Sequence, residues 1–187
     1  MRVIAGTLRG RKLISPEGQG TRPTSDKLRE SLFNILTHQL EVGFSGLRVA
    51  DIFAGTGALG IEAISRGALS CTFIEKHAGP TSAIFKNLRD LDLEDVTKLQ
   101  RVSASALPHR KKGFDLILMD PPYSMGLADV GLKSIVDSNW CNKGSIIVVE
   151  SHVSDAIKIP EELTEINNRK YGKTKIQILK FGLTSTE

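Results

Sequence analysis

Three glycines in the first third of the chain could hold a ligand. Gly55, Gly57 and Gly60 follow the apolar stretch 47–53 at the spacing Gly-x-Gly-x-x-Gly. Gly55 and Gly57 let the backbone turn sharply and approach a ligand closely, and Gly60 lets the helix that begins in the turn pack against the strand. In dinucleotide sites this spacing places a pyrophosphate at the helix N-terminus. A turn that binds nothing is the simpler alternative.

Two acidic residues near this turn indicate which ligand it holds. Asp51 ends the strand, and its carboxylate would repel a phosphate but would stabilise an ammonium or another cation. S-adenosylmethionine carries both an α-ammonium and a sulfonium, so Asp51 favours this cofactor over a dinucleotide. Glu75 follows Gly55 by twenty residues, a position from which a carboxylate can accept hydrogen bonds from both hydroxyls of a ribose. Glu75 suits NAD and S-adenosylmethionine equally well.

A second candidate site is the segment Asp120-Pro121-Pro122-Tyr123, which follows the apolar stretch 114–119. The two prolines make the loop rigid and offer no N–H group, so the loop presents acceptors beside an aromatic ring. Such a site suits an exocyclic amino group on a flat base, because that group has two N–H donors. Tyr123 could stack on the base. A plain turn is the alternative, since Asp and Pro both favour turns.

The chemistry expected of this loop is methyl transfer to an amine. The lone pair of an arylamine is delocalised into the ring, so its nitrogen is a poor nucleophile. Acceptors on both N–H bonds favour the pyramidal form, and Asp120 can stabilise the positive charge that develops on the nitrogen and can direct or take the departing proton. The nitrogen must lie about 3–3.5 Å from the methyl carbon, in line with the carbon–sulfur bond. This mechanism requires no metal.

The elements that must position these residues alternate from residue 47 onward. Alternating strands and helices are typical of an α/β fold, a parallel sheet with helices on both faces. We expect strands at about 47–53, 69–75, 98–103, 114–119 and 145–150, and helices at about 58–66, 79–91 and 126–138. Ligands of such sheets bind at the carboxyl ends of the strands. The residues expected at these ends are Asp51, Glu75, Ser103 or Ala104, Asp120 and Glu150.

The C-terminal part is expected to close the sheet. A short helical piece at 153–157 precedes two strands, 164–171 and 174–181, that flank a Gly172-Lys173 turn and form an antiparallel hairpin. The 187 residues are enough for one domain with a small appendage, so we expect a single core.

All of the excess positive charge lies in the first thirty residues. The net charge is +4, and residues 1–30 hold seven bases and three acids, whereas the remaining 18 bases and 18 acids cancel. Segments 2–5 and 11–14 can form a small hairpin or two extended arms, and a helix capped by Thr24 can continue to about Gln39. Positive charge on one side is typical of a surface that binds a polyanion. A solvated basic edge is the alternative.

The remaining composition indicates a cytoplasmic soluble protein. Hydrophobic residues make up 40% of the chain, no apolar run reaches the ~18 residues of a membrane span, and the first residues contain no signal-peptide core. The two cysteines, Cys71 and Cys141, favour neither a disulfide framework nor a cysteine-rich zinc site, and both suit a reducing compartment.

Several of these motifs together resemble a known family. Segment 51–57, Glu75 and segment 120–123 resemble Rossmann-like S-adenosylmethionine-dependent amino-methyltransferases. Nearly the full chain also resembles one branch, the bacterial 16S ribosomal RNA guanine-N2 methyltransferases of the RsmD type. The segments that resemble this branch are 2–6, 9–13 and 21–36. Asp-Pro-Pro-Tyr is shared by adenine-N6, cytosine-N4 and guanine-N2 enzymes, so this motif alone does not identify the base. The resemblance of the three N-terminal segments to this branch is what implies guanine.

The resemblance implies both a fold and an activity. The fold would be that of a class I methyltransferase, with a mostly parallel seven-stranded sheet, a closing antiparallel hairpin, and a small N-terminal hairpin and helix. Residues 1–40 would form an extension that docks RNA and closes over the cofactor, and residues 41–187 would form the methyltransferase domain. The enzyme would act as a monomer on guanine 966 of 16S ribosomal RNA in an assembly intermediate of the small subunit.

The same resemblance assigns the site residues. The expected cofactor-binding residues are Thr21, Arg22, Pro23, Asp51, Phe53, Ala54, Gly55, Gly57, Gly60, Glu75, Lys76, Ser103 and Ala104. The expected catalytic residues are Asp120, Pro121, Pro122 and Tyr123. The expected RNA-binding residues are Arg2, Arg9, Arg11, Lys12 and Arg22. Many methyltransferases have an acid after the third strand, whereas this chain has only small residues at 103–105, so adenine recognition falls to the Ser103 hydroxyl or the Ala104 backbone.

Other functions compete with this interpretation. A nicotinamide-dependent oxidoreductase would explain the glycine turn and Glu75 but would leave Asp51 and segment 120–123 without a role. A non-catalytic RNA-binding module would explain the basic N-terminus but would leave both candidate sites unused. Within the methyltransferases, the alternative is transfer to adenine N6 or cytosine N4 in RNA or DNA.

Overall fold

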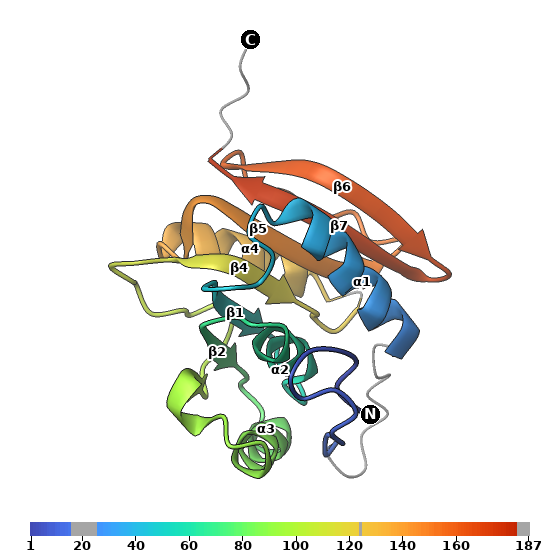
Figure 1. Cartoon of the computed structure of the whole chain (residues 1–187). Helices are drawn as coiled ribbons and strands as arrows, with labels where there is room; N and C mark the ends of the chain where they lie inside the picture. The colour runs from blue at the N-terminus through green and yellow to red at the C-terminus, as the bar shows by residue number, and fades with distance from the viewer. Residues whose placement is uncertain (16–25, 124, 183–187) are drawn as a thin grey trace.

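One sheet of seven strands organises the chain (Figure 1). The structure, a computed structural model, describes residues 1–15, 26–123 and 125–182. The strands are β1 (Arg48–Ile52), β2 (Ser70–Ile74), β3 (Thr97–Gln100), β4 (Phe114–Met119), β5 (Cys141–His152), β6 (Leu163–Tyr171) and β7 (Thr174–Phe181). Their order across the sheet is β3-β2-β1-β4-β5-β7-β6. Strands β1 to β5 pair in parallel and β7 is antiparallel to both β5 and β6, which confirms the predicted topology.

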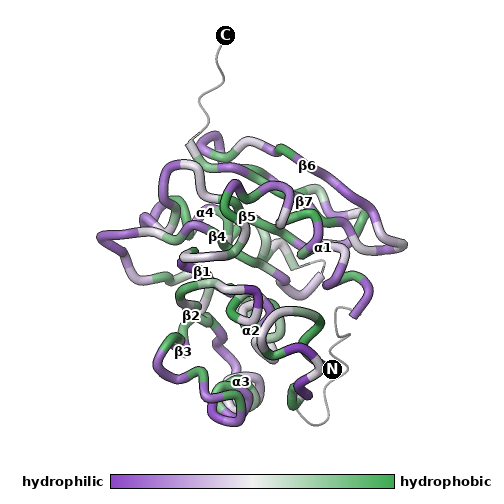
Figure 2. The backbone as a smooth tube through the Cα atoms, in the orientation of Figure 1, coloured by the Kyte–Doolittle hydropathy of each residue, from purple (hydrophilic) through white to green (hydrophobic). Residues whose placement is uncertain are grey.

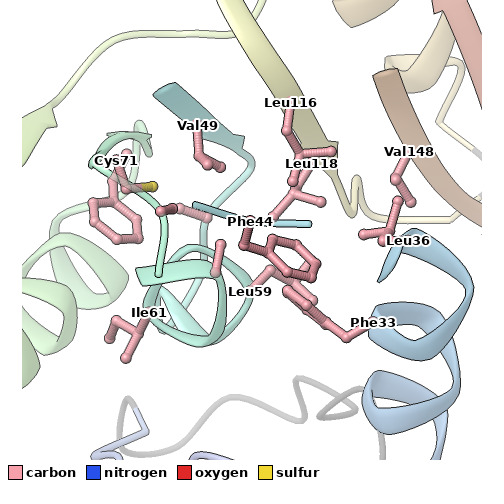
Figure 3. Close-up of a cluster of buried hydrophobic side chains, with 14 of the residues drawn as sticks. Phe33, Leu36, Phe44, Val49, Leu59, Ile61, Cys71, Leu116, Leu118 and Val148 are labelled. Atoms are coloured by element: carbon pink, nitrogen blue, oxygen red, sulfur yellow. The ribbon is translucent and has the colours of Figure 1, made fainter. Parts of the chain in front are cut away.

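Alternate side chains of the central strands enter two separate cores, one on each face of the sheet. Val49, Leu116, Leu118 and Val148 belong to the first core (Figure 3). Ala50, Ile117, Met119 and Ile147 belong to the second core. Because both faces are covered, the central strands are almost continuously apolar, whereas β6 at the edge of the sheet is largely hydrophilic (Figure 2).

Four α-helices in the described residues complete these cores. They are α1 (Asp26–Gln39), α2 (Ala58–Ser65), α3 (Ala78–Asp90) and α4 (Leu127–Asp137). Leucines and isoleucines of α1, α2 and α3 enter the first core, where Phe33 of α1 also packs on Phe44 with ring centroids 5.4 Å apart (Figure 3). Leu132 and Ile135 of α4 enter the second core. Trp140 is fully buried there, and its indole N–H donates to the Pro108 carbonyl.

Three details differ from the sequence prediction. Residues 153–157 form a turn and an irregular stretch instead of a short helix. β5 is longer than predicted and runs from Cys141 to His152. Its first residue pairs with Phe114 of β4, and its last residues pair with β7 up to His152 opposite Thr174. β3 ends at Gln100, so Ser103 and Ala104 lie in the loop after the strand, and a short 3₁₀ helix, Glu94–Val96, precedes it.

The N-terminal residues pack onto the same core as the sheet. Arg2 and Lys12 form an isolated antiparallel bridge, which confirms a small hairpin there. Val3 and Leu13 are buried in the first core. Glu62 of α2, fully buried, accepts hydrogen bonds from the backbone N–H groups of Ile4 and Ala5 at 2.8 and 3.0 Å. Its carboxylate also pairs with the side chains of Arg29 and Arg66. No helix in the described residues is long and apolar enough to span a membrane.

Candidate active site

The carboxyl ends of the parallel strands open onto one large cavity. Its volume is about 1110 Å³, and it is lined by residues that follow β1, β2, β3 and β4 and by Glu150 near the end of β5. The predicted site residues that line this cavity are Asp51, Phe53, Ala54, Gly55, Glu75, Lys76, Ser103, Ala104, Asp120, Pro121, Pro122 and Tyr123. The glycine turn and the Asp-Pro-Pro-Tyr loop therefore face the same space. A donor and an acceptor bound at these two places would share one chamber.

The glycine turn has the geometry that the sequence predicts. Gly55 and Gly57 have φ values of 56° and 77°, in the left-handed region that favours glycine. Gly57 and Gly60 do not line the cavity; they permit packing beneath it. A Cβ on Gly60 would lie 2.4 Å from Cε1 of Phe73 and 2.6 Å from Sγ of Cys71, so only glycine brings α2 this close to β2. Phe53, with φ of 63°, is a rare non-glycine residue in the same backbone region, and such strain is typical of functional turns.

Glu75 is held beside this turn by two backbone groups. Its Oε2 accepts a hydrogen bond from the Gly55 N–H at 3.1 Å, and its Oε1 accepts one from the His77 N–H at 2.8 Å. The residue is only 7% exposed, although it lines the cavity. Each carboxylate oxygen can accept a further hydrogen bond, so Glu75 is fixed in place and can still bind two hydroxyl groups.

Asp51 lies deeper and is 1% exposed. Its Oδ2 accepts a hydrogen bond from the Gly60 N–H at 2.9 Å, which ties β1 to the first turn of α2. Burial raises the pKa of Asp51 well above its ordinary value; the Gly60 N–H opposes this shift, and the negative charges of Asp120 and Glu75 add to it. Three carboxylates thus converge on one end of the cavity. A ligand that brings positive charge would relieve their repulsion, whereas a phosphate would increase it.

Tyr123 is fixed by hydrogen bonds at its hydroxyl group. The hydroxyl donates to Oε1 of Glu150 at 2.8 Å and lies 3.0 Å from Oγ1 of Thr174. Burial raises the pKa of Tyr123 to about 12, with a smaller contribution from Glu150, so the phenol stays protonated and remains a donor at neutral pH. The ring therefore has a fixed orientation at the cavity wall, 5.9 Å from the ring of His152.

The structure does not bring every predicted residue to the cavity. Arg2, Arg9, Arg11 and Lys12 do not line it. All four are exposed; the side chain of Arg2 also pairs with Asp26, and Arg11 also donates to the Asp90 carbonyl. Thr21, Arg22, Pro23 and the expected cap Thr24 lie outside the described residues. Among the described residues there is no cluster of His, Cys, Asp or Glu placed to hold a metal.

Comparison with known proteins agrees with this geometry. Residues 1–180 match the profile of a family described as Conserved hypothetical protein 95, which is the RsmD family. The chain belongs to the RsmD family.

Named relatives of this family member are methyltransferases. Ribosomal RNA small subunit methyltransferase D of Haemophilus influenzae is 34% identical over 92% of this chain and 89% of that protein. The protein of the same name from Escherichia coli is also 34% identical, over 84% of this chain and 77% of that protein.

Solved structures show the same fold. A methyltransferase structure from Escherichia coli matches with a TM-score of 0.84 and 30% identity, covering 98% of this chain and 99% of that one. A methyltransferase structure from Pyrococcus horikoshii matches with a TM-score of 0.70 at 15% identity, over 94% of each chain. The fold is therefore that of the Rossmann-like methyltransferases, as predicted, and this RsmD-family member is a methyltransferase that uses a methyl donor.

The cavity of this RsmD-family member is also lined by residues that the sequence analysis did not select. Tyr171 and Thr174, which flank the turn between β6 and β7, line it beside Tyr123. A signal was available, because β7 runs antiparallel to β5 and must therefore begin at the edge where β5 ends. Glu150 was expected at a strand end but was not assigned a role. Its bond to Tyr123 joins segments 27 residues apart in the sequence.

Proposed function

We propose that this protein transfers a methyl group from S-adenosylmethionine to the exocyclic N2 of a guanine in 16S ribosomal RNA. The observation that carries the proposal is the single cavity that holds both the glycine turn with Glu75 and the Asp120-Pro121-Pro122-Tyr123 loop. The Haemophilus influenzae and Escherichia coli relatives are methyltransferases of small-subunit ribosomal RNA by name, which supports the class of substrate. The resemblance of the N-terminal segments supports guanine as the base.

The donor end of the cavity fits a cationic cofactor. When bound there, S-adenosylmethionine supplies a methyl group attached to a positively charged sulfur. Glu75, fixed by Gly55 and His77, would accept hydrogen bonds from the two ribose hydroxyls. Asp51 would face the positive charge of the ligand, which would offset the repulsion from its negative neighbours. The same acidic cluster disfavours the pyrophosphate of NAD, so it argues against an oxidoreductase.

The acceptor end fits a base amine. Asp120 would accept from one N–H of the amine, and the carbonyls of the proline loop would accept from the other. These acceptors keep the nitrogen lone pair out of the ring, and Asp120 stabilises the positive charge that develops on the nitrogen as the bond to carbon forms. The same carboxylate can direct or take the departing proton. A base inside a helix cannot enter this chamber, so the target must be flipped out or already unpaired, at a cost of a few kcal/mol. Stacking on Tyr123 would offset part of that cost.

The basic N-terminus would dock the RNA. Arg9 and Lys12 are exposed, and Arg2 and Arg11 lie on the same small hairpin. We also propose that residues 21–24 close over the cofactor, that the protein acts as a monomer in the cytoplasm, and that residues 1–40 work as one RNA-docking extension.

One experiment tests the proposal directly. Mass spectrometry of nuclease-digested 16S ribosomal RNA, from cells with and without this gene, should show one N2-methylguanosine that disappears with the gene. A methyl group at adenine N6 or cytosine N4 would instead establish the alternative acceptor. Calorimetry with S-adenosylmethionine and with NAD separates the enzyme classes: binding of NAD alone would support the oxidoreductase, and binding of neither would support a non-catalytic module.

A further inference from the structure

The turn between β6 and β7 lies at the same edge of the sheet as the candidate active site. β7 is antiparallel to β5 and pairs with it up to His152 opposite Thr174, so β7 begins where β5 ends. β6 ends beside it, with Tyr171 opposite Thr174 (Figure 1). Both Tyr171 and Thr174 line the cavity. Residues 169–175, here called the β6–β7 tip, therefore form part of the cavity rim.

The β6–β7 tip is strongly basic. Its seven residues include Arg169, Lys170, Lys173 and Lys175 and no acid. Arg169, Lys170 and Lys173 are exposed, and none of them forms an ion pair with another residue that the structure describes. Lys170 also lies directly opposite Lys175 in the strand pair. Like charges in that position destabilise a sheet, so this arrangement suits a surface that an anion neutralises.

The β6–β7 tip is anchored at both strands. The Tyr171 hydroxyl lies 2.8 Å from the Ser31 hydroxyl of α1, which ties the end of β6 to that helix. The Thr174 hydroxyl lies 3.0 Å from the Tyr123 hydroxyl, which ties the start of β7 to the proposed catalytic loop. Lys175 donates to the Asp155 carbonyl at 2.7 Å. The strand ends that carry the positive charges are therefore anchored close to Asp120-Pro121-Pro122-Tyr123.

The cavity and its rim have opposite charges. Among the described residues, the lining of the cavity includes four carboxylates, those of Asp51, Glu75, Asp120 and Glu150, and only two lysine or arginine side chains, those of Arg29 and Lys76, whereas the β6–β7 tip adds positive charge at the mouth. A nucleotide has a neutral base with amine donors and a negatively charged phosphate. This field favours an orientation in which the base points inward and the phosphates stay at the rim.

We propose that the β6–β7 tip is a second RNA-docking surface, which holds the phosphates beside the target nucleotide while its base occupies the cavity. This inference rests on the proposed function, because it takes RNA as the substrate. It differs from the N-terminal docking surface, which lies on a separate hairpin and carries different basic residues. The N-terminal surface would hold the RNA as a whole, and the β6–β7 tip would place one nucleotide.

The test compares two variants that change the net charge equally. The tip variant carries Arg169→Ala, Lys170→Ala and Lys173→Ala. The control variant carries Lys111→Ala, Lys112→Ala and Lys143→Ala. These three exposed residues lie just before β4 and near the start of β5, at the amino ends of the strands, whereas the cavity lies at the carboxyl ends. Affinity for 16S ribosomal RNA transcript is measured by titration at several salt concentrations, alongside calorimetry with S-adenosylmethionine, thermal unfolding and steady-state kinetics.

The tip variant should bind RNA more weakly, and the slope of log affinity against log salt should fall by about two, or about 0.7 for each phosphate that the protein no longer neutralises. Its KM for RNA should rise while kcat and cofactor affinity stay unchanged. The control variant should keep the wild-type slope. If the tip variant unfolds early, the single variant Lys173→Ala should still lower the slope by about 0.7. If the tip and control variants show the same salt slope and the same KM for RNA, while the wild-type protein methylates the RNA, this inference alone is overturned. Wild-type protein that neither binds nor methylates the RNA would overturn the proposed function.

Discussion

Glu75 tests the donor site at the level of one residue. Its carboxylate accepts hydrogen bonds from the Gly55 and His77 N–H groups, and we propose that it also binds the ribose hydroxyls. Glu75→Ala should weaken binding of S-adenosylmethionine by about 1.5–3 kcal/mol, the contribution of hydrogen bonds to a charged group. Calorimetry measures the loss, and Glu94→Ala, which removes an exposed acid at the 3₁₀ helix, is the control. Unchanged affinity of the Glu75 variant would mean that this carboxylate does not bind the donor.

Asp51 should make donor binding depend on pH. Its folded-state pKa is raised, mainly by burial, so the donor-free protein keeps this proton to a higher pH than the unfolded chain does. The stability that comes from the protonated form is full below the ordinary pKa and is lost as pH rises through the raised pKa. A cationic donor favours the carboxylate, so binding should release a proton and donor affinity should rise with pH.

Calorimetry in buffers of different ionisation enthalpy counts the released proton. Asp51→Asn, which cannot titrate, should bind the donor more weakly and with a flatter pH dependence. A wild-type affinity that stays constant or falls as pH rises would contradict the proposed placement of positive charge beside Asp51.

Asp120 tests the catalytic step. Its proposed hydrogen bond to the substrate amine would strengthen only as charge develops on the acceptor nitrogen, so Asp120→Ala and Asp120→Asn should abolish methyl transfer while leaving donor and RNA affinity nearly intact. Single-turnover reactions with labelled cofactor measure the step. Transfer at a near wild-type rate would remove Asp120 from the mechanism.

Two variants of Tyr123 separate the role of its ring from the role of its hydroxyl group. Tyr123→Ala should impair RNA binding and turnover together, because it removes the ring. Tyr123→Phe keeps the ring but removes the hydroxyl that bonds to Glu150 and Thr174. Its effect on transfer should be mild if stacking is the role of the ring. A decrease in Tyr123→Phe as large as that in Tyr123→Ala would show that the fixed orientation of the ring matters more than its surface.

At the scale of elements, the packing of α2 on β2 depends on the absence of a side chain at Gly60. Gly60→Ala would place a Cβ 2.4 Å from the Phe73 ring, so α2 must move away and the Asp51–Gly60 bond must stretch. We expect a decrease of about 1–3 kcal/mol in the free energy of unfolding, as in other overpacked cores. Gly79→Ala in α3 is the control, because a Cβ there meets no atom within 4 Å, and it should stabilise the helix by roughly 0.5–1 kcal/mol. Urea unfolding measures both; equal stability of the two variants would contradict the packing argument.

The elements that the sequence predicted well are those with strong local patterns. The apolar stretch 114–119 coincides with β4, and the Gly172-Lys173 turn lies between β6 and β7 as expected. The predicted helix at 153–157 was wrong because five residues cannot nucleate a helix alone. There Val153 donates to the Lys173 carbonyl and continues the pairing of β5 with β7, and the Asp155 carboxylate accepts from the His152 N–H. Such tertiary partners are not visible in a local window.

At the scale of the whole molecule, the N-terminal basic hairpin should contribute a salt-dependent share of RNA binding. Arg9→Ala, Arg11→Ala and Lys12→Ala together should weaken binding and lower the salt slope by about 0.7 for each phosphate of single-stranded RNA that these residues neutralise. Cofactor affinity should not change, because none of the three residues lines the cavity. RNA titration at several salt concentrations measures the slope. An unchanged slope would leave these residues as a solvated edge.

The residues that line the cavity could be predicted from strand ends, but their partners could not. Asp51, Glu75 and Asp120 were placed by one rule, that ligands of parallel sheets bind at the carboxyl edge. The bond between Tyr123 and Thr174 joins residues 51 apart and depends on the register of β5 against β7. The basic β6–β7 tip was missed for a different reason: bases and acids after residue 30 cancel in the total, which hides a local excess of charge.

The buried carboxylate of Glu62 has a practical consequence for work with this protein. By binding the backbone of Ile4 and Ala5, it fixes the first residues against α2, and Met1 reaches the cavity wall, where its sulfur accepts from the Thr56 hydroxyl at 3.7 Å. Any polypeptide attached ahead of Met1, such as a purification tag, would therefore emerge at the mouth of the cavity. RNA affinities measured with such a fusion would include any interference from the tag at this place.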